Sequence, residues 1–137
     1  SLLRAFYGIM LADLGRHEDA LAVARENFDW AEGTNMIHMR TEARRCLAHV
    51  RFRMGEHDEA LRLCEEILAL TASVESRMTR LYIGPMHVET LLAIGRGDDA
   101  RATLATYAEM VAQCQSPMFT REVDRLRSLV GADAPRP

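Results

Sequence analysis

Apolar residues recur at spacings of three and four along most of the chain, and polar residues occupy the positions between them. This is the pattern of amphipathic helices that each pack on one side. Short polar segments with glycine separate the runs and predict turns. We therefore expect three pairs of helices, at about residues 2–14 and 17–32, 36–54 and 57–72, and 76–94 and 97–114.

A seventh helix is predicted to follow these pairs. Ser116-Pro117 provides an N-cap residue followed by proline in the first turn, and Gly131 lies just beyond the expected end. Its apolar positions are predicted to cover the last pair, as solenoid proteins need at their ends. These positions are Val123, Leu126, Leu129 and Val130.

The pattern Gly-x-x-acid-acid-Ala occurs three times at a spacing of 40 residues, at 15–20, 55–60 and 95–100. The glycine is expected to end the first helix of a pair with a positive φ angle. The acidic residues then fall in the first turn of the second helix, where they complement the macrodipole. The alanine lets the two helices approach closely. The structural repeat positions are Gly15, Ala20, Gly55, Ala60, Gly95 and Ala100.

Apolar positions on both sides of this turn recur in the same register, and we expect them to form the core. Before the turn they are Leu3, Ala43 and Ile83, then Phe6, Cys46 and Met86, then Leu14, Met54 and Ile94. After the turn they are Ala24, Cys64 and Leu104, followed by Asn27, Ile67 and Tyr107.

The pattern predicts an all-α fold, a right-handed α-solenoid of three antiparallel helix hairpins plus a C-terminal capping helix. One domain would span residues 1–131, with repeats at about 1–33, 34–73 and 74–114 and a cap helix at 116–131. Residues 132–137 are expected to form a disordered tail. Gly84-Pro85 interrupts one predicted helix, so we expect a kink there or a helix that restarts at Pro85.

Composition narrows the class of protein. The net charge is −3, so the basic excess of a nucleic-acid-binding segment is missing. No apolar run is long enough to cross a bilayer, and three widely spaced cysteines favour the reducing cytoplasm. All 17 basic residues are arginine, which indicates a GC-rich bacterial genome. The chain opens within an apparent helix and without a signal peptide, so we expect a fragment of a longer protein.

With these features the chain resembles the tetratricopeptide repeat family. That family has a glycine at the end of the first helix and an alanine five positions later, and Gly8, Leu47 and Ala48 also match its small and large positions. The period of 40 residues exceeds the family's 34. Longer repeats of this kind are similar to those of bacterial regulators related to the maltose activator and of peptide-pheromone sensors, in which they receive a ligand or partner.

Candidate chemistry is sparse, and we expect neither catalysis nor a cofactor. Cys46 and His49 lie three apart and Cys64 could approach them, but a fourth metal ligand is not evident. Cys46 and Cys64 fall at repeated apolar positions, which favours core packing over metal binding. Cys114 has no histidine or acid close in the sequence that would activate it as a nucleophile.

The resemblance implies that the first helix of each pair lines a concave groove. The expected partner-binding residues are Arg45, His49, Phe52, Arg53, Tyr82 and Glu89. Arg45, His49 and Arg53 are four apart on one helical face, and guanidinium groups bind carboxylates bidentately. An acidic peptide or other anionic ligand would suit this groove. The alternative is a solvated face balanced by Glu42 and Glu89.

The sequence therefore predicts a non-catalytic protein-interaction scaffold within a larger bacterial regulator. The alternative is a sensor domain that holds a small ligand or peptide and controls an attached DNA-binding or nucleotide-binding effector. A closed, partly apolar cavity under the concave face would favour the sensor, and a flat, open groove or a symmetric contact would favour the scaffold. Self-association is a further expectation, through an apolar edge around Leu2, Leu3 and Phe6.

Overall fold

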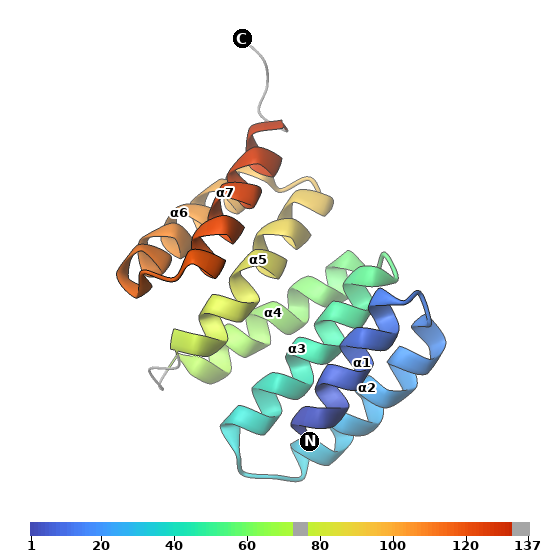
Figure 1. Ribbon diagram of the computed structural model, residues 1–137. Helices are drawn as coiled ribbons and strands as arrows, with labels where there is room; N and C mark the ends of the chain where they lie inside the picture. Colours follow the sequence, from blue (N-terminus) through green and yellow to red (C-terminus); the bar gives the residue numbers. More distant parts are fainter. Residues whose placement is uncertain (73–76, 133–137) are drawn as a thin grey trace. The chain divides into compact units, whose positions relative to one another are not determined.

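A computed structural model describes residues 1–72 and 77–132, which form seven α-helices and no strand (Figure 1). This confirms the all-α prediction. The chain divides into two compact units, Ser1–Ser76 and Arg77–Pro137. The predicted linker at 73–76 and residues 133–137 of the predicted tail lie outside the described residues.

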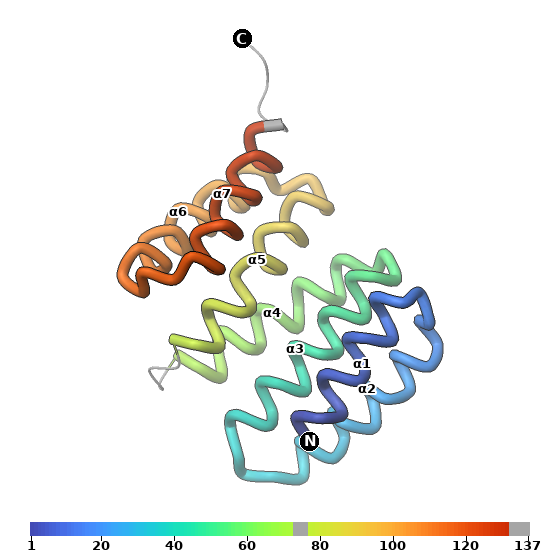
Figure 2. Tube along the Cα trace, viewed as in Figure 1, coloured from blue at the N-terminus to red at the C-terminus, as the bar shows by residue number. Residues whose placement is uncertain are grey.

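The first unit consists of two helical hairpins. Its helices are α1 (Leu2–Asp13), α2 (His17–Glu32), α3 (Ile37–Arg53) and α4 (His57–Thr71). Helix α3 pairs with α4 and also packs against both helices of the preceding hairpin, so the two hairpins stack (Figure 2). Ala20 and Ala60 are fully buried where the helices of each hairpin cross, as the repeat pattern predicts.

The turns between paired helices have the geometry that the repeated glycine predicts. Gly15, Gly55 and Gly95 have φ angles of 79°, 80° and 81°. In the first turn the Gly15 amide donates to the carbonyl of Ala12, and the next amide, that of Arg16, donates to the carbonyl of Leu11. This is the hydrogen-bond pattern of a Schellman motif, which satisfies the last carbonyls of the helix. The equivalent bonds occur at Gly55 and Gly95.

The second unit contains one hairpin and a final helix that packs on both of its members. These are α5 (Arg77–Ala93), α6 (Gly97–Cys114) and α7 (Pro117–Ala132). Val123, Leu126 and Val130 of α7 are buried, as expected of a covering helix. Leu129 is exposed instead, because the buried face of α7 turns through Phe119 and Val123. The helix also continues past Gly131 to Ala132, which the predicted tail had included.

Helix α5 continues through Pro85, so the expected restart at that residue is wrong. Proline lacks the amide that would bond the carbonyl of Leu81 four residues earlier. The hydroxyl of Tyr107, on α6, donates to this same carbonyl at 2.9 Å. Gly84 gives the Tyr107 ring room, because a Cβ atom there would lie only 2.5 Å from Cε2 of that ring. The neighbouring helix thus supplies the hydrogen bond that proline removes.

One predicted core stripe is only partly buried. Ala43, Cys46 and Ile83 are buried as expected, but their equivalents on α1, Leu3 and Phe6, are exposed, and so is Leu14. The expectation for α1 was therefore wrong. The stripe of α3 is covered by the hairpin α1–α2, whereas no helix of the described first unit covers the same face of α1.

Candidate binding surface and a buried charged network

The predicted basic residues Arg45, His49 and Arg53 lie on α3, and each of them contacts an acidic side chain of the first unit. Arg45 donates two hydrogen bonds to Oε2 of Glu42, from Nε at 3.0 Å and from Nη2 at 2.7 Å. Both of these side chains are mostly buried. Part of the predicted basic charge is therefore neutralised one helical turn away.

Asp13, at the end of α1, neutralises much of the remaining charge. Its Oδ1 atom lies 2.7 Å from Nε2 of His49 and 3.7 Å from Nε of Arg53. We expected Glu42 and Glu89 to balance the charge of these basic residues, and we did not predict the contact with Asp13. A signal was present, since Asp13 occupies the repeat position of Arg53.

Arg53 remains the most available of these cations. Its side chain is 46% exposed, and the contact from Nε to Asp13 is long for an ion pair. Its contact with Asp13 is an ion pair without a hydrogen bond, unlike the hydrogen-bonded pair of Arg45 and Glu42. A guanidinium exposed to this degree can bind a carboxylate bidentately.

The predicted aromatic and acidic members of the surface pack elsewhere. Phe52 contacts the ring of His57 edge-on, with centroids 4.9 Å apart, at the turn between α3 and α4. In the second unit, Tyr82 packs against Phe119 of α7 with centroids 5.5 Å apart. Glu89 forms an ion pair with Arg125, also on α7. These contacts favour a packing role for Tyr82 and Glu89.

The cysteine residues have the surroundings of core side chains. Burial raises the pKa of the Cys46 thiol to about 11 and that of Cys64 to about 12, so both stay protonated at neutral pH. Thiols in this state are poor nucleophiles and poor metal ligands. The half-buried Cys114 donates through Sγ to the carbonyl of Met110. Nowhere in residues 1–72 and 77–132 do three His, Cys, Asp or Glu side chains gather in a way that could hold a metal ion.

A surface hollow of about 450 Å³ lies at the turn between α3 and α4. Most of its lining residues are charged; the full lining is Arg51, Gly55, Glu56, His57, Asp58 and Glu59. This hollow is open and lies at a turn, so it is not the closed, partly apolar cavity under the concave face that the sensor alternative predicts.

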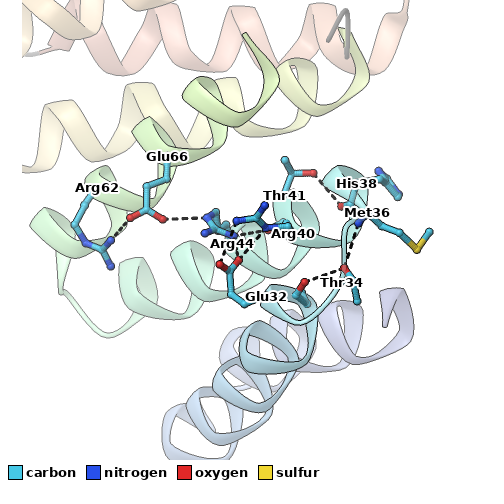
Figure 3. Close-up of polar contacts among 10 residues, drawn as sticks. Glu32, Thr34, Met36, His38, Arg40, Thr41, Arg44, Arg62 and Glu66 are labelled. Carbon is cyan, nitrogen blue, oxygen red and sulfur yellow. Dashed lines mark hydrogen bonds and ion pairs between the residues drawn. The ribbon is translucent and has the colours of Figure 1, made fainter. Parts of the chain in front are cut away.

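A largely buried charged cluster of the first unit was not predicted from the sequence. Arg44, on α3, has a side chain only 8% exposed and contacts two acids, Glu32 on α2 through Nη1 at 2.6 Å and Glu66 on α4 through Nε at 3.0 Å (Figure 3). Its guanidinium also lies 4.8 Å from the centre of the Phe28 ring. We call Arg44, Glu32 and Glu66 the Arg44 network. It joins three helices and both hairpins.

More exposed arginines extend this network at each end. Arg40 contacts Glu32 at 3.3 Å, and Arg62 forms an ion pair with Glu66 (Figure 3). An earlier repeat carries a simpler version, in which Arg4 contacts Glu26 at 3.1 Å. Because Arg4 and Glu26 lie 40 residues before Arg44 and Glu66, the repeat contained a signal for this contact.

We expect the Arg44 network to make the first unit less stable in acid. Hydrogen bonds from Arg44 and Arg40 lower the pKa of Glu32 from 4.5 to about 2. A lowered pKa stabilises the fold above the unfolded pKa, and that contribution disappears as the pH falls from about 5 towards 2. Because Glu32 is about one-third exposed, we expect a loss of about 1 kcal/mol.

Urea denaturation at several pH values, followed by the fluorescence of Trp30 in the first unit, measures this loss. Glu32→Gln should flatten the pH dependence between pH 5 and 2, whereas Glu26→Gln, at an exposed ion pair, should not. Equal pH dependence in the wild type and Glu32→Gln would contradict the assignment.

Together, the stacked hairpins, the glycine turns and the small residues at the helix crossings define a helical-hairpin repeat protein. Residues 1–26 and 41–66 match the tetratricopeptide repeat family. The chain therefore carries two segments similar to tetratricopeptide repeats, and both lie in its first unit. Repeats of this family mediate protein–protein interactions.

No curated protein and no solved structure matches the chain significantly. A search of the described helices finds none with both the length and the apolar character needed to cross a bilayer.

Proposed function

We propose that the chain is a non-catalytic interaction module of a larger bacterial regulatory protein. We also propose that an acidic peptide binds the surface of α3 that carries His49 and Arg53. The matched family supports the interaction role. The arginine-only basic composition supports a bacterial source, and three free thiols support a cytoplasmic location.

One observation carries the acidic-peptide proposal: His49 and Arg53 already hold a carboxylate, that of Asp13, between them. The Arg53 side chain is 46% exposed, so its guanidinium can bind a second carboxylate from a peptide. Arg45 is held by Glu42, so its role is to support the surface and not to make the main contact. The sensor alternative gains no support from the hollow at the α3–α4 turn, whose lining residues are mostly charged.

Fluorescence anisotropy with a labelled decapeptide rich in Asp and Glu tests this surface. Arg53→Ala should weaken binding about tenfold, since a hydrogen bond to a charged group contributes about 1.5–3 kcal/mol. The matched control is Arg16→Ala, which removes a similarly exposed arginine paired with Asp19 at the first turn. Unchanged affinity for Arg53→Ala, or equal weakening by Arg16→Ala, would remove this surface from the proposal.

A further inference from the structure

Helix α1 carries an exposed apolar stripe. Leu3, Phe6, Tyr7, Met10 and Leu14 are all exposed, and Leu3 reaches 82%. Residues 3, 7, 10 and 14 have the alternating spacing of four and three that forms the seam of a helix pair. We call these five residues the α1 stripe. Such a continuous apolar surface on a helix marks an interaction site.

The equivalent face of α3, in the next repeat, shows what kind of structure can cover the α1 stripe. The equivalents of Leu3, Phe6, Tyr7 and Met10 on α3 are all buried, and α3 packs there against the first hairpin. These equivalents are Ala43, Cys46, Leu47 and Val50. The face is therefore a helix-packing face, and its occupant on α1 is expected to be helical.

The side chains of the α1 stripe are larger than their counterparts on α3. Leu3, Phe6 and Met10 replace Ala43, Cys46 and Val50, so the α1 stripe is much bulkier than its counterpart on α3. Large side chains suit two helices that interdigitate at a greater distance.

The α1 stripe is also free of charge. The charged residues of α1 are Arg4 and Asp13, which lie outside the stripe and contact Glu26 and His49 respectively. Covering the stripe would therefore bury no unpaired charge. Two identical stripes can face each other without opposing like charges.

We propose that the α1 stripe is a self-association surface, on which α1 of a second copy packs in antiparallel orientation. Large side chains bury about 150–250 Å² each when fully covered. The five side chains of the α1 stripe are between 47% and 82% exposed and offer on the order of 500 Å² per copy. A pair therefore buries on the order of 1,000 Å², the lower limit for a specific interface. Antiparallel pairing also places the positive end of one macrodipole beside the negative end of the other. The expected product is a dimer of micromolar affinity.

Sedimentation velocity of the 137-residue chain, from low to several hundred micromolar, tests the proposal. The wild type should change from monomer to dimer over this range, and Met10→Glu should weaken the dimer at least tenfold. Met36→Glu is the matched control, because Met36 is 57% exposed, against 52% for Met10, and lies outside the α1 stripe. A wild type that stays monomeric, or a dimer that Met10→Glu leaves intact, would overturn the proposal.

Disulfide cross-linking tests the orientation in a Cys114→Ser background. In an antiparallel pair, a Tyr7→Cys chain mixed with a Met10→Cys chain should give a mixed dimer in preference to either homodimer. A preference for the homodimers would overturn the antiparallel arrangement. The proposal is independent of peptide binding, because Arg53→Ala should leave dimerisation unchanged and Met10→Glu should leave peptide affinity unchanged.

Discussion

Replacing Gly84 with alanine is expected to lower the free energy of unfolding of the second unit by about 3 kcal/mol, at the upper end of the usual cost of overpacking. The added Cβ would lie 2.5 Å from Cε2 and 3.0 Å from Cγ of Tyr107. That ring is buried, and its hydroxyl is bonded to the carbonyl of Leu81. The ring cannot move aside without breaking this bond, which would leave a buried carbonyl and a buried hydroxyl without partners.

Urea denaturation followed by far-ultraviolet circular dichroism measures this effect. Gly131→Ala is the matched control, because it also adds a methyl group to a helical glycine but finds nothing within 4 Å. A second test combines Gly84→Ala with Tyr107→Ile, the residue found at the equivalent position 67. The double variant should recover much of the stability lost by Gly84→Ala with Tyr107 present. A Gly84→Ala protein as stable as the wild type would show that the close approach has no energetic role.

Arg44→Ala is expected to destabilise the first unit by about 2–3 kcal/mol. The substitution leaves Glu32 and Glu66 without their shared partner and removes the guanidinium beside Phe28. The full cost of a broken buried ion pair is higher, but both carboxylates are about one-third exposed and can be hydrated by water. Arg44→Lys should give an intermediate loss, since a single ammonium group cannot reproduce the two-sided contact.

The fluorescence of Trp30 reports on the unit that contains Arg44, so it should detect this loss during urea denaturation. Arg62→Ala provides the comparison, because it removes an exposed arginine bonded to the same Glu66 and should cost less than about 0.5 kcal/mol. If Arg44→Ala and Arg62→Ala had equal effects, burial of the Arg44 network would not matter for stability.

Structural features that depend only on residues within one repeat could be predicted from the sequence. A glycine that ends a helix depends only on local backbone geometry, so Gly15, Gly55 and Gly95 identified the turns. Helix spans followed for the same reason, and the predicted range 17–32 coincides with α2. The handedness of the solenoid and the domain boundaries remain predictions.

Features that depend on a second helix could not be predicted in the same way. Leu3 and Ala43 occupy the same repeat position, yet only Ala43 has a hairpin packed over it. Likewise, the sequence showed that Gly84-Pro85 would disturb a helix, but not that Tyr107 would compensate from α6. For the candidate site, the basic residues of α3 were identified, whereas their engagement by Asp13 depends on how α1 lies beside α3.

The three turns require glycine for a different physical reason than position 84 does. Gly15, Gly55 and Gly95 have positive φ, yet an added Cβ atom would meet nothing within 4 Å. Space is plentiful there, so the constraint comes from the handedness of natural amino acids, which makes this backbone region costly for L-residues by about 1–2 kcal/mol. A mirror-image D-residue, even a large one, would suit these corners and would have less freedom than glycine when unfolded. The hairpin corners are thus sites where chirality, and not size, decides which residue is tolerated.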